Sequence, residues 1–136
     1  MASKEHMAKK MVPVIVLVED DKQLVEMYRE RFKKENFIVE VATDGDLAIK
    51  VINQERPDMV LLDLMLPKKG GINVLQILKS NPETKEIPVI VLTAYPQDEY
   101  RVATLRDGAI DFISKSEVMP KEVVERVKKA INWESK

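Results

Sequence analysis

The chain has 136 residues, 45% of them hydrophobic and 33% charged, with a formal net charge of −1 at pH 7. This length suits one domain with a single core, and the composition excludes a disordered chain. The near-neutral charge gives no reason to expect nucleic acid or a membrane surface as a partner. The sequence has no cysteine, which excludes disulfides and thiolate metal sites and is typical of a reducing compartment, so we expect a cytoplasmic protein.

Residues 1–10 form a polar segment that contains His6, the one histidine of the chain. A second methionine, Met7, follows His6 directly, as expected of a natural start behind a cloning leader. We therefore predict a leader over residues 1–10 and a single domain over residues 11–136. No apolar run approaches the ~20 residues that a membrane-spanning helix needs.

Apolar runs alternate with amphipathic segments along the rest of the chain. In chain order, the first half predicts a strand at Val12–Val18, a helix at Lys22–Lys34, a strand at Phe37–Val41, a helix after the N-cap Asp44 and a strand at Met59–Leu62. The second half predicts a helix at Ile72–Ser80, a strand at Pro88–Leu92, a helix at Gln97–Arg106, a strand at Ala109–Ile113 and a helix that begins at Pro120. Short β-branched runs are typical of strands, and apolar residues at helical spacing are typical of amphipathic helices.

Strands that alternate with helices form a parallel sheet with helices on both faces. Right-handed crossovers leave few strand orders, and the two less purely apolar runs, Phe37–Val41 and Ala109–Ile113, suit the edges. The predicted fold class is therefore α/β: a flavodoxin-like, doubly wound sheet of five parallel strands in the order 2-1-3-4-5, with five helices. Its ligand site is expected where the strand order reverses, between the first and third strands.

Polar side chains follow the carboxyl ends of four predicted strands. They are Glu19 and Asp20 after the first, Asp63 after the third, Thr93 and Ala94 after the fourth, and Lys115 after the fifth. Close carboxylates repel unless a cation neutralises them, and oxygen ligands without histidine or cysteine select Mg²⁺ or Mn²⁺. A lysine and a hydroxyl beside such a cation suit phosphoryl transfer, with Asp63 as the nucleophile that forms an acyl phosphate.

Four motifs together resemble the receiver domain of two-component response regulators. They are Val-Leu-Val-Glu19-Asp20-Asp21, Leu-Leu-Asp63-Leu-Met-Leu-Pro67, Val-Leu-Thr93-Ala94 and Phe112-Ile-Ser-Lys115. Each motif is weak alone, but the four occur in the right order and at the right strand ends. The resemblance covers about Val12 to Trp133, nearly the whole chain.

The resemblance implies that a histidine kinase or histidine phosphotransfer protein phosphorylates Asp63. It implies a Mg²⁺ site, for which Mn²⁺ could substitute, with Asp20 and Asp63 as direct ligands. Glu19 would bind this metal mainly through water, and Met65 would bind it through its backbone carbonyl. A receiver domain of this kind is not an enzyme in the ordinary sense, because it catalyses only its own phosphorylation and dephosphorylation.

The resemblance also implies how the signal leaves the site. Thr93 and Lys115 would hold the phosphoryl oxygens, and Ala94 would be the small residue beside the phosphate. Thr93 would move on phosphorylation, and Phe112 would swing inward behind it. The surface formed by the fourth helix, fifth strand and fifth helix would then change its protein partner.

No output domain follows Lys136 in this sequence. We therefore expect a stand-alone regulator of the chemotaxis or phosphorelay type, monomeric or weakly dimeric. The family usually has proline after the lysine, joined by a cis bond, but Ser116 follows Lys115 here. Since a cis bond before a non-proline residue costs about 2.5–4 kcal/mol, we expect a trans peptide.

Other interpretations stay open at this stage. Asp21 could simply cap the following helix, Phe112 could be ordinary core, and a degenerate receiver could act without phosphorylation. An aspartyl-phosphate phosphatase would need a second acid two residues after its nucleophile, where this chain has Met65. A flavodoxin-like FMN carrier would need a phosphate-binding loop after the first strand, where the acidic Glu19–Asp21 segment would repel phosphate.

Met65 and Tyr95 follow Asp63 and Thr93 by two residues each. We expect their side chains to flank the phosphoryl group. Both are bulky, and neither carries an acid or an amide. They should therefore shield the acyl phosphate from attacking water and lengthen its lifetime.

Overall fold

A computed structural model of the chain describes residues 12–134, so the predicted leader over residues 1–10 lies outside the described part. The strands are β1 (Val14–Val18), β2 (Ile38–Ala42), β3 (Met59–Leu62), β4 (Val89–Thr93) and β5 (Asp111–Ser114). The helices are α2 (Lys22–Lys34), α3 (Gly45–Glu55), α4 (Gly71–Ser80), α5 (Asp98–Arg106) and α6 (Pro120–Ala130). None of these helices has the length and apolar character that crossing a bilayer would require.

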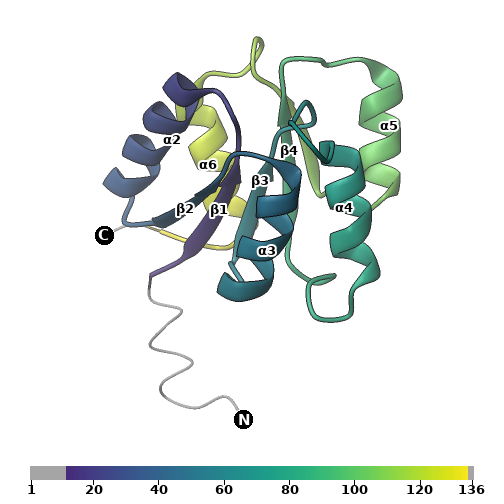
Figure 1. Cartoon of the computed structure of the whole chain (residues 1–136). Coiled ribbons are helices and arrows are strands. Elements are labelled where there is room, and N and C mark those ends of the chain that lie inside the picture. The colour runs from purple at the N-terminus through teal and green to yellow at the C-terminus, as the bar shows by residue number, and fades with distance from the viewer. Residues whose placement is uncertain (1–11, 135–136) are drawn as a thin grey trace.

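The strands form one parallel sheet in the order β2-β1-β3-β4-β5 (Figure 1). This confirms the predicted fold class and strand order. Val18 lies opposite Leu62 across β1 and β3, so the residues that follow these strands emerge side by side. The sheet reverses its order between β1 and β3, and ligands of such sheets bind beyond the carboxyl ends at that point.

Helices cover both faces of the sheet. One face buries Val18, Leu62, Val91 and Phe112 against α3 and α4, with Tyr100 of α5 packed beside them. The other face buries residues such as Leu61 against α2 and α6. Because successive side chains of a strand point to opposite faces, a strand buried on both faces has the continuous apolar sequence seen here.

Four of the five predicted strands, β1, β2, β4 and β5, begin one or two residues further along the chain than expected. β4 extends to Thr93, because Thr93 pairs with Ser114 and its carbonyl accepts a hydrogen bond from the N–H of Lys115 at 2.8 Å. β5 begins at Asp111 rather than Ala109, whose N–H instead donates to the carbonyl of Thr104 at 2.9 Å. Thr93 is therefore the last residue of β4, and its pairing with β5 fixes the position of its side chain at the carboxyl edge of the sheet.

Two aspartates begin helices by capping them. Asp21 accepts hydrogen bonds from the N–H groups of Gln23 and Leu24 at 2.9 and 3.1 Å, and Asp44 accepts one from Leu47 at 2.8 Å. These bonds satisfy N–H groups that have no partner within a helix. The interpretation of Asp21 as a helix cap is thus confirmed. Asp21 therefore differs from Glu19 and Asp20, which belong to the acidic cluster.

Candidate functional site

Three carboxylates meet beyond the ends of β1 and β3. Glu19, Asp20 and Asp63 each place a carboxylate oxygen within 4.8 Å of the others. Glu19 and Asp63 are buried, with 2% and 6% of their surface exposed, whereas Asp20 is exposed. The cluster therefore has a buried floor and one carboxylate open to solvent.

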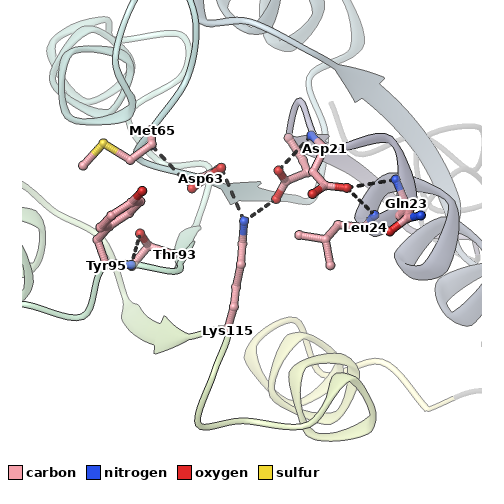
Figure 2. A network of polar contacts seen from close by, with 9 residues as sticks. Asp21, Gln23, Leu24, Asp63, Met65, Thr93, Tyr95 and Lys115 are labelled. Carbon is pink, nitrogen blue, oxygen red and sulfur yellow. Dashed lines mark hydrogen bonds and ion pairs between the residues drawn. The ribbon is translucent and has the colours of Figure 1, made fainter.

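Lys115 reaches this cluster from the end of β5 (Figure 2). Its Nζ lies 2.6 Å from Oε1 of Glu19 and 3.4 Å from Oδ2 of Asp63. The peptide bond between Lys115 and Ser116 is trans, as expected. The lysine thus neutralises part of the acidic charge while it stands directly beside Asp63.

Burial dominates the electrostatics of the two inner acids. Desolvation raises the pKa of the Glu19 carboxyl, while the hydrogen bond from Lys115 opposes that rise. Desolvation likewise raises the pKa of the Asp63 carboxyl, against the positive charge of Lys115 and the N–H of Met65. A positive charge at this place favours the ionised form of both acids, which a nucleophilic carboxylate requires.

Thr93 is fully buried at the end of β4. Its Oγ1 accepts a hydrogen bond from the N–H of Tyr95 at 3.0 Å. A hydroxyl can accept and donate at once, so this bond leaves the Thr93 proton available for a further acceptor. Ala94, between these two residues, is exposed.

Met65 and Tyr95 project beside Asp63, on the side away from Asp21 (Figure 2). Met65 is 42% exposed and Tyr95 is 48% exposed. The N–H of Met65 lies 3.4 Å from Oδ1 of Asp63, a long contact that still orients the carboxylate. Both bulky, exposed side chains thus lie next to Asp63.

The start of α4 packs against the backbone of Asp63. A Cβ atom added at Gly71 would lie 2.3 Å from the carbonyl oxygen of Asp63 and 2.6 Å from Cα of Leu64. The N–H of Gly71 donates to the carbonyl of Leu64 at 2.9 Å. Only glycine allows this approach, which holds the segment that carries Asp63.

The donor set fits a hard divalent cation. Each of the three residues offers a carboxylate oxygen as a ligand, and the part of the chain that the structure describes contains neither histidine nor cysteine. Carboxylate and carbonyl oxygens are the ligands that Mg²⁺ and Mn²⁺ prefer. Glu19, Asp20 and Asp63 are therefore compatible with divalent metal binding.

The close pairing of Lys115 with Glu19 was not predicted from the sequence. The two residues are 96 positions apart, and no local pattern shows which carboxylate of the cluster lies nearest to the lysine. Phe112 is buried, with 3% of its surface exposed, which suits the interpretation as core and leaves its role as a switch a prediction.

Residues 15–128 match the response regulator receiver domain family. The chain belongs to this family. Receiver domains are signalling domains rather than classical enzymes, and they take phosphoryl groups from histidine kinases. The recognition drawn from the four motifs is therefore confirmed.

Relatives and solved structures agree with this assignment. The phosphate regulon transcriptional regulatory protein PhoB of Klebsiella pneumoniae is 40% identical over 114 residues, which cover 84% of this chain and 49% of PhoB. The BeF3-activated N-terminal receiver domain of Klebsiella pneumoniae RstA superposes with a TM-score of 0.80 at 33% identity, over 87% of this chain and 97% of that one. The Mn²⁺-bound response regulator Rcp1 superposes with a TM-score of 0.78 at 31% identity, over 86% and 92%. The chain thus spans about half the length of PhoB.

Proposed function

We propose that Asp63 accepts a phosphoryl group from a histidine kinase or a histidine phosphotransfer protein. The observation that carries this proposal is the placement of Lys115 Nζ at 3.4 Å from the Asp63 carboxylate, within a buried acidic cluster at the end of β3. A buried carboxylate with a cation beside it and a hydroxyl nearby has the parts that phosphoryl transfer requires.

The transfer exchanges one bond to phosphorus for another. An oxygen of the Asp63 carboxylate attacks the phosphorus of a phosphohistidine on the donor protein. An oxygen–phosphorus bond forms, the nitrogen–phosphorus bond breaks, and the imidazole leaves with the electron pair and takes up a proton. The Lys115 ammonium has three donors, so it can bind a phosphoryl oxygen while it keeps its bond to Glu19.

Thr93 supplies a second donor to the phosphoryl group. Its hydroxyl proton can turn to a phosphoryl oxygen, because its acceptor side already binds the N–H of Tyr95. The metal would be Mg²⁺, held by Asp20, Asp63, the Met65 carbonyl and, mainly through water, Glu19. A bound Mg²⁺ would neutralise negative charge that develops on the phosphoryl oxygens.

The output surface comprises α5, β5 and α6. Thr93 ends β4, and α5 begins at Asp98 after a short segment, so movement of Thr93 toward a phosphoryl group would pull on α5. We propose that Phe112 follows this movement as the switch residue and that a downstream protein reads the changed surface.

Incubation of the full chain with acetyl phosphate and Mg²⁺, followed by intact-mass spectrometry, tests the proposal. We expect an acid-labile gain of one phosphoryl group on the parent protein and no gain on Asp63→Ala. No gain on the parent would overturn the proposal, and it is the result expected of a degenerate receiver that acts only as an interaction module.

Met65 and Tyr95 should set the lifetime of the acyl phosphate. Their exposed side chains border Asp63, so they can exclude the water that attacks phosphorus. The double variant Met65→Asn and Tyr95→Glu should dephosphorylate faster than the parent, and Met119→Asn, an exposed methionine on another loop, should not. An unchanged or longer lifetime in the double variant would contradict the shielding role.

The wider setting of the protein is also a proposal. We propose a cytoplasmic regulator that is a monomer or weak dimer and signals to a protein rather than to nucleic acid. PhoB is a transcriptional regulatory protein, and the similarity covers 49% of its length. Light scattering of the full chain, with and without acetyl phosphate, would show which oligomeric state accompanies phosphorylation.

A further inference from the structure

The side chain of Arg101 lies on the ring of Phe112. Its guanidinium carbon is 4.7 Å from the ring centroid, within the range of a cation–π interaction. Arg101 is on the exposed side of α5, whereas Phe112 is buried in β5 with 3% of its surface exposed. The arginine therefore covers the outer side of the ring.

Arg101 contacts the ring of Phe112 even though an acidic residue lies one helical turn away on α5. Asp98 precedes Arg101 by three residues on the same helix, a spacing at which ion pairs form. Among residues 12–134, however, no carboxylate lies within ion-pair distance of Arg101. The guanidinium contacts the aromatic ring instead.

This contact is one of few ties between α5 and the rest of the protein. Thr104 is the single buried residue of α5. Its hydroxyl donates to the carbonyl of Tyr100 at 2.7 Å and lies 3.3 Å from that of Arg101, so it bonds within the helix rather than to the sheet. A helix held this loosely depends on contacts such as Arg101 with Phe112 for its position.

Phe112 also stands on the same face of the sheet as Thr93. Val91 lies opposite Phe112, and Thr93 lies opposite Ser114 two residues further along. Side chains two residues apart in a strand point the same way, so the Thr93 hydroxyl and the Phe112 ring share one face. Thr93 and Phe112 therefore lie on neighbouring strands, one register position apart along the same face.

We propose that Arg101 is a positioning residue that holds Phe112 in its buried place and thereby favours the phosphorylated form of the protein. The effect on phosphorylation rests on the proposed function, in which the inward ring accompanies phosphorylation of Asp63. The effect of Arg101 on the position of the Phe112 ring does not depend on that function, so it can be measured in the unphosphorylated protein.

Fluorine NMR of the full chain, labelled with 4-fluorophenylalanine, tests the proposal. The chain has three phenylalanines, and Phe32 and Phe37 lie together in the other layer, 5.3 Å apart between centroids. These two serve as an internal check that each variant is folded, and Phe112→Leu assigns the third signal. The variants are Arg101→Met, which keeps the stem without the charge, Arg101→Lys, which keeps a cation, and Arg106→Met as the control.

In Arg101→Met we expect the Phe112 signal to move toward the position of a solvent-exposed fluorophenylalanine, while the other two signals stay. Arg101→Lys and Arg106→Met should keep the parent position, since lysine also binds an aromatic face and Arg106 pairs with Asp107 at 3.5 Å. An unchanged Phe112 signal in Arg101→Met would overturn the proposal.

Binding of beryllofluoride with Mg²⁺ then tests the link to phosphorylation. We expect Arg101→Met to bind this phosphoryl analogue about two- to fivefold more weakly than the parent, the change that one partly exposed cation–π contact produces. Arg101→Lys should bind like the parent. Equal affinity in Arg101→Met would overturn the link, whereas a parent protein that shows no Asp63-dependent binding would overturn the proposed function instead.

Discussion

The helix pair α2 and α6 and the single helix α5 are held to the sheet in different ways. The pair buries Val25, Tyr28 and Phe32 from α2, and Val123, Val124 and Val127 from α6. In contrast, α5 buries only Thr104 and leaves Val102 62% exposed. The same sheet thus has a firmly packed side and a weakly attached helix.

Further contacts lock the pair. The ring of Phe37 meets Phe32 edge-on at 5.3 Å and Trp133 at 6.3 Å between centroids. The indole N–H of Trp133 donates to the carbonyl of Glu35 at 3.0 Å. These contacts join α2, the residue before β2 and the segment after α6 into one packed unit.

The difference in buried surface indicates which helix can move in response to a change at the site. An element with little buried apolar surface opens or shifts at a small free-energy cost, whereas opening a well-packed layer costs a free energy that approaches that of global unfolding. The proposed phosphorylation of Asp63 would therefore move α5 while α2 and α6 stay in place.

The largest expected effect would come from the packed layer. Phe32→Ala removes a fully buried ring, so we expect the free energy of unfolding to fall by about 3–5 kcal/mol. Val102→Ala on α5 should change it by less than about 0.5 kcal/mol. Urea denaturation followed by the fluorescence of Trp133, the sole tryptophan, measures both. A loss in Val102→Ala as large as that in Phe32→Ala would contradict the comparison.

An intermediate effect is expected where α4 meets Asp63. Gly71→Ala would place a methyl group against backbone atoms of Asp63 and Leu64, so we expect a loss of about 1–3 kcal/mol and slower phosphorylation by acetyl phosphate. Gly70→Ala is the matched control, since its added Cβ would meet no atom nearer than 3.9 Å. Equal stability and equal rates in the two variants would show that the site does not depend on this close approach.

Much of this arrangement follows from the sequence. Short apolar runs ended by Glu19, Asp63, Thr93 and Lys115 predict one site, because parallel strands deliver their carboxyl ends to one edge. The polar sequence of Gln97–Arg106 already sets this helix apart. These features can be predicted from the sequence, since each depends on residues that are close together in the chain.

Other features depend on tertiary geometry, and no local pattern contains them. The choice of Glu19 as the nearest partner of Lys115 depends on how β1 and β5 approach the site. The contact of Arg101 with Phe112 depends on the angle of α5, and spacing alone favours a pair with Asp98. The start of β5 at Asp111 depends on pairing with Ile90 in β4.

The smallest effect concerns the charge at the site itself. Burial raises the pKa of Asp63 above its ordinary value, so the folded protein keeps a proton on this carboxyl at pH values where the unfolded chain has lost it. This stabilising contribution is complete below the unfolded pKa of about 3.9 and is lost as the pH rises through the folded value.

Asp63→Asn removes that pH dependence. At pH 8 without divalent metal, we expect the variant to melt higher than the parent by no more than about 4 °C, the shift that about 1 kcal/mol gives in a domain of this size. Near pH 4 the two melting temperatures should agree. Calorimetry at several pH values in EDTA measures the difference. A variant that melts lower than the parent at pH 8 would show that the buried carboxylate stabilises the metal-free protein.

Hydrogen exchange with and without acetyl phosphate and Mg²⁺ tests the central claim most directly. We expect the amides of α5 and the segment before it to change their exchange on phosphorylation, while those of α2 and the core of α6 do not. Asp63→Asn should show no change anywhere. Equal changes in α2 and α5, or a change in α5 that persists in Asp63→Asn, would contradict the account.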